Sequence, residues 1–170
     1  MSFLKDLLGV EDTLKKPHTR ISSQEAHQLW NLSQMHHIFL NNIRLNINFV
    51  HDKDFKYVLK KHCDYFQTEV EKIEAIMEKY SLKSAKPSPP NINLPERVEL
   101  MQDENIANLL YVFLKANISV QIKTINDAIF SDKLRQLFIK FIKEAVNKLD
   151  QYIEDLKSKN WIEYPPLYKS

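Results

Sequence analysis

The prolines of this chain divide it into two long blocks that lack both proline and glycine. Four of the seven prolines lie between positions 87 and 95, and the single glycine is Gly9. Proline interrupts a helix, because its ring removes an amide donor and clashes with the preceding turn. Residues 18–86 and 96–164 contain neither residue type. The proline-rich stretch therefore predicts a linker between two segments that can each form long helices.

Each block contains two amphipathic segments separated by a short polar break. In all four segments, apolar side chains recur at spacings of three and four, which is typical of α-helices with one buried face. The four predicted helices span residues 23–51, 54–80, 103–128 and 131–158. A shift of 79 residues, from Asp52 to Ser131, places the second pair of segments on the first and indicates an internal repeat.

Polar residues at the predicted helix starts have the spacing of N-terminal caps. Ser22 and Glu25 form the pattern of a capping box, in which a hydroxyl and a carboxylate each accept a backbone amide of the other residue. The residues predicted to cap the second and fourth helices are Asp52 and Ser131, or their neighbours Asp54 and Asp132.

The length of the linker selects the order of the helices in space. A helix of about 28 residues is roughly 42 Å long, and about 21 extended residues span roughly 65 Å. The linker can therefore return along the bundle, so that the second and third helices run parallel. This predicts an all-α, ferritin-like four-helix bundle, made of two helical hairpins joined by one long crossover. The predicted layout is a lead-in at 1–21 and one domain at 22–170, with hairpins at about 23–80 and 103–158, a crossover at 81–102 and a tail at 159–170.

The composition argues against several classes of partner. The net charge is only +2, from 24 basic and 22 acidic residues, so no nucleic-acid partner is predicted. Cys63 is the single cysteine, which rules out an internal disulfide and a cysteine-built zinc site. No uninterrupted apolar run approaches the roughly 20 residues of a membrane span. The first residues lack the apolar segment of a signal peptide, and we expect synthesis in the cytoplasm.

Short motifs lie early in the first predicted helix, at the first polar break and after the last helix. They are Leu29-Trp30, Asp-Lys-Asp-Phe-Lys at 52–56, and Asn160-Trp161 followed by Pro165-Pro166. In these motifs and in its layout from about residue 22 onward, the chain resembles the spore coat F-like families of ferritin-like helical proteins in endospore-forming bacteria. Relatives usually carry glycine where this chain has Asn160, which also tolerates the left-handed conformation. The resemblance implies a structural, spore-associated role, with no established activity or site to carry over.

A ferritin-like fold raises the question of a metal site in the core. The usual di-iron site needs Glu-x-x-His on two helices, and no such motif occurs here, so no di-iron site is predicted. His36, Glu69 and Glu144 fall at a similar height on inward faces and form a weaker candidate site for one metal ion. The favoured interpretation of His36 and Glu69 is a buried hydrogen bond, since a buried polar group needs a partner.

The predicted helices also carry more apolar residues than one bundle seam requires. This surplus predicts an interaction surface that includes Trp161, Tyr164, Leu40 and Ile139. The partner would be another copy of the chain or another coat protein. The alternative for the aromatic tail is that it folds back over the helix ends.

Two functions remain open at this point. The first is a non-enzymatic structural protein of the spore coat that needs no cofactor, since the sequence contains no recognisable catalytic motif. The alternative is a bundle that binds a metal ion or a small molecule near His36 and Glu69.

Overall fold

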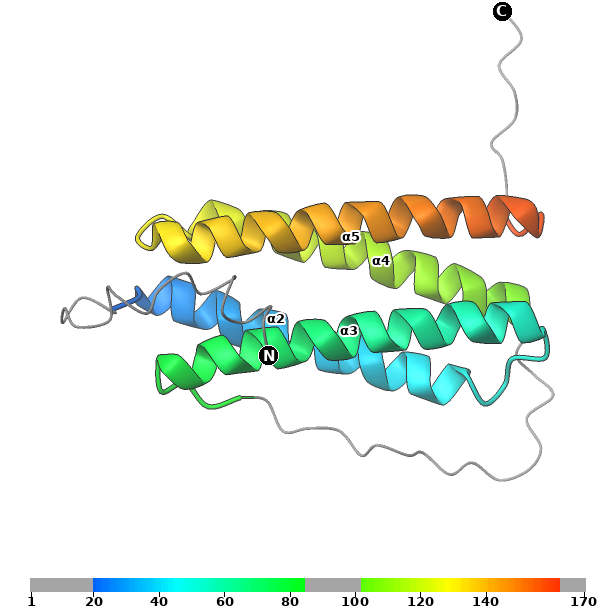
Figure 1. Cartoon of the computed structure of the whole chain (residues 1–170), viewed down its shortest axis with the longest axis horizontal. Coiled ribbons are helices and arrows are strands. Elements are labelled where there is room, and N and C mark those ends of the chain that lie inside the picture. Colours follow the sequence, from blue (N-terminus) through cyan, green and yellow to red (C-terminus); the bar gives the residue numbers. More distant parts are fainter. Residues whose placement is uncertain (1–19, 85–101, 163–170) are drawn as a thin grey trace, which may run out of the picture.

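The computed structural model describes residues 20–84 and 102–162, and this part of the chain forms four α-helices and no strand (Figure 1). The helices are α2 (Ser23–Asn46), α3 (Lys53–Lys79), α4 (Asp103–Asp127) and α5 (Asp132–Ser158). The predicted all-α four-helix fold is confirmed. The predicted lead-in, most of the predicted crossover and most of the tail lie outside the described residues.

Hydrogen bonds at the two ends of the bundle fix the direction of each helix. Asp103, the first residue of α4, accepts the backbone amides of His51 and Asp52 at 3.0 and 2.7 Å, so α4 starts beside the start of α3. At the opposite end, Glu25 accepts the amide of Ser131 at 2.6 Å, so α2 and α5 also start together. Helices α3 and α4 therefore run parallel, as the linker length predicted, and Figure 1 shows this arrangement.

α2 ends earlier than its apolar pattern predicts. The predicted helix extended to residue 51, whereas α2 stops at Asn46 and a turn follows. The side-chain amide of Asn46 donates to the carbonyl of Asn42, and that of Asn48 donates to the carbonyls of Arg44 and Leu45. Side-chain amides that bond to nearby carbonyls compete with helical backbone bonds, and here they accompany the end of the helix.

The apolar core consists of two clusters, one toward each end of the bundle. The cluster beside the start of α3 includes Phe39, Ile43, Phe55, Leu59, Phe66, Leu110, Leu114, Tyr152 and Leu156. The cluster at the other end includes Leu29, Leu32, Ile73, Met77, Leu134, Phe138 and Phe141. Between them, each helix contributes polar side chains at one level of the bundle. We call this level the polar layer; its main members are His36, Tyr65, Glu69, Lys72, Asn117, Gln121 and Glu144.

The predicted caps are confirmed at three helix starts. Ser22 and Glu25 form a complete capping box, and Ser131 accepts the amide of Leu134 at 3.4 Å. Asp52 accepts the amides of Asp54 and Phe55, each at 2.9 Å. These contacts satisfy amides that the helix itself leaves without an acceptor.

Replacement of Asp52 by alanine is expected to lower the free energy of unfolding by about 1 kcal/mol at neutral pH, because it removes this cap. Asp54→Ala is the matched control, since Asp54 is exposed and makes no cap bond with its side chain. Urea denaturation of the two variants and of the unmodified protein would measure the difference. Equal losses for both variants would contradict the assignment of the cap.

The effect of Asp52→Ala should also depend on pH. The hydrogen bond from Lys159, together with those from the helix amides, lowers the pKa of Asp52 below its usual value of 3.8. A lowered folded-state pKa means that the contribution is present above the unfolded value and is lost as the pH falls through the folded value. The gap between Asp52→Ala and the unmodified protein should therefore shrink on acidification below about pH 4.

Candidate functional site

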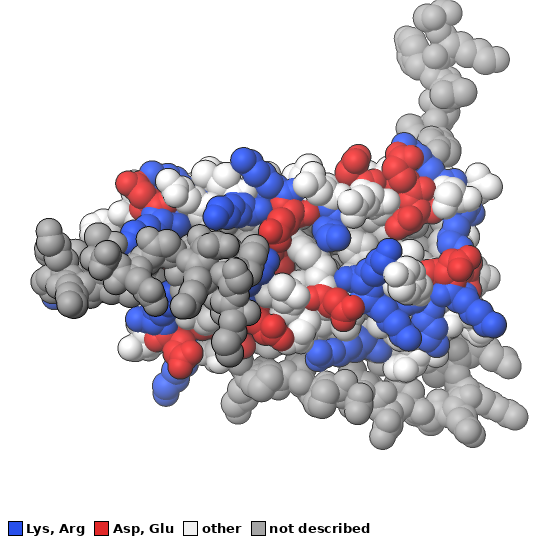
Figure 2. Space-filling model, viewed as in Figure 1, with Lys and Arg blue, Asp and Glu red and all other residues white. Residues whose placement is uncertain are grey.

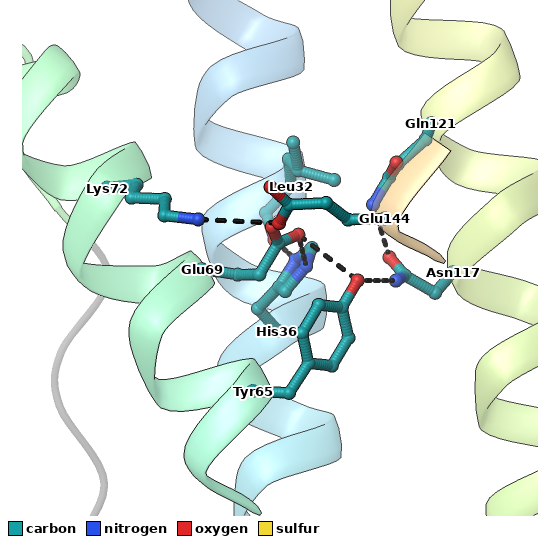
Figure 3. Close-up of polar contacts among 8 residues, drawn as sticks. All are labelled: Leu32, His36, Tyr65, Glu69, Lys72, Asn117, Gln121 and Glu144. Carbon is teal, nitrogen blue, oxygen red and sulfur yellow. Dashed lines mark hydrogen bonds and ion pairs between the residues drawn. The ribbon is translucent and has the colours of Figure 1, made fainter. Parts of the chain in front are cut away.

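The candidate site lies in the middle of the bundle, where the polar layer separates the two apolar clusters (Figure 3). His36 projects from α2, Glu69 from α3, Asn117 from α4 and Glu144 from α5. The side chains of His36 and Glu69 are 0% exposed. Charged or polar groups buried to this extent are retained only where they find partners.

His36 is held by an acceptor on each side of its ring. Its Nδ1 atom lies 2.7 Å from the carbonyl oxygen of Leu32, and its Nε2 atom lies 3.3 Å from Oε2 of Glu69. A carbonyl oxygen only accepts, so Nδ1 carries a hydrogen. The predicted hydrogen bond between His36 and Glu69 is confirmed.

A chain of hydrogen bonds continues from Glu69 to α4. The hydroxyl of Tyr65 lies 3.5 Å from Oε2 of Glu69 and accepts from the amide of Asn117 at 3.3 Å. Gln121 in turn donates to Asn117 at 3.1 Å. Burial, followed by the charge of Glu69, raises the pKa of Tyr65 far above its usual value, so the hydroxyl stays protonated and can donate to the carboxylate. A polar residue on the inward stripe of a predicted helix, as at Asn117, is the sequence signal for this chain of bonds.

Glu144 binds Lys72. The ammonium group of Lys72 lies 3.4 Å from Oε2 of Glu144, and the Lys72 side chain is largely buried beside the ring of Phe141. Lys72 stands three residues after Glu69, in the position that histidine takes in the Glu-x-x-His motif of di-iron bundles. Sequence reasoning missed Lys72 because it searched that position only for a metal ligand.

The charges of the polar layer can thus be balanced by its own side chains. Two carboxylates, Glu69 and Glu144, face two basic groups, His36 and Lys72. Among the residues that the structure describes, no three histidine, cysteine or acidic side chains lie close enough to hold a metal ion together. In the observed geometry, the predicted metal candidates therefore divide into one His–Glu pair and one Lys–Glu pair.

Two buried oxygen atoms in the layer nevertheless have no hydrogen-bond partner among the described residues. They are Oε1 of Glu69 and Oε1 of Gln121. Leaving a buried acceptor unpaired costs about 1–3 kcal/mol, so a bound group with hydrogens or positive charge would be stabilised there. These two unpaired oxygen atoms are the observation that supports a binding role for the core.

His62 and Cys63 lie outside the polar layer and show no sign of activation. Burial first, and then the charges of Lys148 and Lys61, lower the pKa of His62 to about 4, so its ring is neutral at physiological pH. The ring packs edge-on against Tyr152, with centroids 5.2 Å apart. Burial raises the pKa of Cys63, which disfavours the reactive thiolate.

The surface above His62, formed by α3 and α5, carries both signs of charge. Figure 2 shows basic and acidic side chains interspersed over this face. A groove of about 370 Å³ runs between the two helices. Its charged lining consists of Lys61, Lys148, Asp150, Glu154 and Asp155. This mixture gives the groove no single preference for an anion or a cation.

The four residues predicted to form an interaction surface lie in different environments. Leu40 is 2% exposed and belongs to the core, so its predicted place on the surface is wrong. Its helical face points into the bundle because α2 packs against both α3 and α4. Trp161 lies edge-on against Phe55, with ring centroids 5.1 Å apart, which is the folded-back alternative. Ile139 is 37% exposed, and Tyr164 lies outside the described residues.

The chain is similar to known proteins in both sequence and fold. A model of the family described as "Protein of unknown function (DUF3231)" matches residues 11–170. The chain belongs to this family. No curated protein sequence matches the chain. Membership of the spore coat F-like families stays a prediction.

Two solved structures share the fold. A protein from Bacillus halodurans, described as a putative spore coat protein, has a TM-score of 0.78 at 19% identity, over 88% of this chain and 96% of that chain. A conserved hypothetical protein from Mycobacterium tuberculosis has a TM-score of 0.65 at 8% identity, over 81% of this chain and 100% of that chain. At these identities the likeness establishes the fold alone. Separately, within residues 20–84 and 102–162 no helix has the length and hydropathy needed to cross a membrane.

A double-mutant cycle would test whether the core pair is coupled. His36→Leu and Glu69→Leu are each expected to cost about 3–5 kcal/mol of stability, because each leaves its buried partner unpaired. The double variant is expected to be more stable than either single variant, because it replaces the pair by apolar groups. Thermal and chemical denaturation would measure all four proteins. Losses that simply add would show that the pair is not coupled.

His37→Leu is the matched control for this cycle. His37 is the adjacent histidine, and it pairs at 3.0 Å with Glu74, whose side chain is partly exposed. Pairs that water reaches contribute little, so the control should change the stability by less than about 1 kcal/mol.

Proposed function

We propose that the protein is a non-enzymatic structural component that acts by association, with copies of itself or with another protein of the spore coat. The observation that carries this proposal is the amount of apolar surface left on the described part of the bundle. Its large exposed apolar side chains are Trp30, Ile38, Tyr57, Val112, Ile122, Ile129, Phe130, Ile139 and Val146. Single exposed apolar residues are ordinary, but neighbouring ones are typical of surfaces that bind other proteins.

The arrangement of the core supports a role without turnover. The carboxylates of Glu69, which is buried, and Glu144, which is partly exposed, are engaged by His36 and Lys72, and the thiol of Cys63 is not activated. A catalytic site needs a nucleophile or base that substrate can reach, together with groups that stabilise developing charge. The described residues do not assemble such a set.

The setting in the spore coat is supported by the name of one fold neighbour and by the resemblance of the short motifs. The Bacillus halodurans protein, which shares the fold, is described as a putative coat protein. For the present chain, the coat is thus a proposal about where association takes place, after synthesis in the cytoplasm.

Fractionation of spores would test this setting. In the bacterium that encodes the chain, we expect the protein to appear during sporulation and to be recovered with the coat fraction of purified, washed spores. A tagged soluble cytoplasmic protein serves as the control for carry-over. Recovery of the chain in growing cells only, with none in the coat fraction, would refute the proposed setting.

The alternative function is binding of a metal ion or a small molecule in the core. It is favoured by two buried oxygen atoms of the polar layer that have no partner among the described residues: Oε1 of Glu69, which binds His36, and Oε1 of Gln121, which binds Asn117. If it holds, protein purified without chelator should contain about one metal ion per chain by elemental analysis, or gain thermal stability when Zn²⁺ or Mn²⁺ is added. Glu69→Gln keeps the shape of the side chain and should abolish the effect. Metal-free protein whose stability is indifferent to added ions would exclude a metal ion and leave only an organic ligand.

A further inference from the structure

The two hairpins can be compared position by position, because their second helices match in length and register. α3 spans Lys53–Lys79 and α5 spans Asp132–Ser158, so both starts and both ends are separated by 79 residues (132 − 53 and 158 − 79). Each residue of α3 therefore has an equivalent in α5, 79 positions later. Differences between equivalents show where the two hairpins have different surroundings.

One outward face differs between the two helices. On α3, Gln67 and Glu74 bind α2 across the outer seam, and the helical spacing places Lys60 and Cys63 on the same side of the helix. Their equivalents on α5 are Ile139, Ile142, Val146 and Ile153. A helix face that contacts water is expected to be polar, and the first hairpin follows this rule while the second departs from it.

Polar pairs cross the outer seam of the first hairpin. Arg44 donates to Gln67 at 3.0 Å, and His37 lies 3.0 Å from Glu74. Both pairs join α2 to α3 across the position where the two helices meet the solvent. At the equivalent positions of α5, Val146 and Ile153 have no group that can form such a pair.

α4 adds apolar side chains to the same surface. The side of α4 that faces α5 is fixed by Ala107, whose carbonyl accepts the hydroxyl of Tyr152 at 2.9 Å. Ile122 lies 15 residues after Ala107, four helical turns and about 60° further round, so it projects from the outer edge of that side. Ile122 is 47% exposed, and Val112, farther out on α4, is 56% exposed. Across the seam on α5, Ile139 and Val146 are 37% and 47% exposed.

We propose that two copies of the chain pair through this surface, which we call the α4–α5 outer face and define by Val112, Ile122, Ile139, Ile142, Val146 and Ile153. The proposal rests on the proposed function, since it names the partner and the surface for self-association. The surface contrasts with the face formed by α3 and α5, which is covered with charges of both signs (Figure 2).

Charges on either side of Val146 favour a second copy over an unrelated partner. Lys143 and Asp150 are exposed and lie seven residues apart on the same side of α5, at the edge where the α4–α5 outer face meets the groove between α3 and α5. In an antiparallel pair of α5 helices centred near Val146, Lys143 of each copy faces Asp150 of the other. The same arrangement brings Ile139 of one copy to Ile153 of the other. A surface that complements itself in this way is what a two-fold dimer requires.

The size of the surface suits a small dimer interface. The stretch from Ile139 to Ile153 is about 21 Å long, and two neighbouring helices are together about 20 Å wide. Each copy would therefore contribute roughly 400 Å², and the pair with its charged rim approaches the lower limit of about 1,000 Å² for a specific interface.

Light scattering of the full chain across a dilution series would test the pairing. We expect a dimer whose dissociation constant rises about thirtyfold or more for Val146→Glu, the factor typical of a residue at the centre of an interface. Gln67→Glu places the same charge at the equivalent position of α3 and is expected to leave the constant unchanged. Both residues lie outside the core, so circular dichroism should show equal helix content in all three proteins.

Charge reversal would test the two-fold register. Lys143→Glu and Asp150→Lys are each expected to weaken the dimer about threefold to tenfold, and the double variant is expected to restore it, because the two charges only exchange places. A double variant as weak as the single variants would overturn the antiparallel pairing.

The remaining outcomes separate this inference from the proposed function. A dimer that resists Val146→Glu would overturn the α4–α5 outer face as the contact while leaving self-association in place. A monomer at every concentration would overturn pairing altogether. Recovery of that monomer in the coat fraction would then assign the association to another coat protein.

Discussion

The buried contact between His36 and Glu69 constrains the whole bundle. It lies between two apolar clusters, and each partner is 0% exposed, so neither side chain can turn to water if the helices shift. Sliding α2 by one turn along α3 would place an apolar residue opposite Glu69 and leave a buried carboxylate unpaired. Polar contacts of this kind contribute less to net stability than to the choice of one arrangement over others. The ion pair between Lys72 and Glu144 joins α3 to α5 at the same level of the bundle. The polar layer therefore fixes the positions of the helices along the bundle axis relative to one another.

Much of the fold could be predicted from the sequence because it depends on local signals. The proline-rich stretch excludes a helix between the two hairpins. The capping residues Asp52 and Ser131 accept backbone amides within the next turn, so their effect is local in sequence. The parallel course of α3 and α4 follows from the length of the linker. The end of α2 was misplaced because the apolar pattern continues past Asn46, whereas the side-chain amides near it bind backbone carbonyls instead.

The site was predicted less completely, since it depends on which faces of different helices meet. The meeting of His36 and Glu69 was predicted because both lie on inward stripes at matching distances from one tight turn. Lys72 and Tyr65 were missed because a lysine or tyrosine beside a stripe is usually solvated, and only the neighbouring helix shows otherwise. Leu40 was misplaced for the same reason: α2 is covered on two sides, by α3 and by α4, so its buried face is wider than one stripe.

The positions at which the bundle begins and ends have a mechanical consequence. α2 starts at one end, beside Ser131, while α5 finishes at the other end, where Lys159 binds Asp52 (Figure 1). A pulling force between these two points acts along the helix axes. To lengthen the molecule, such a force must slide α2 and α5 past their neighbours, which loads many side-chain contacts together. A bundle with this geometry is therefore expected to resist tension in shear.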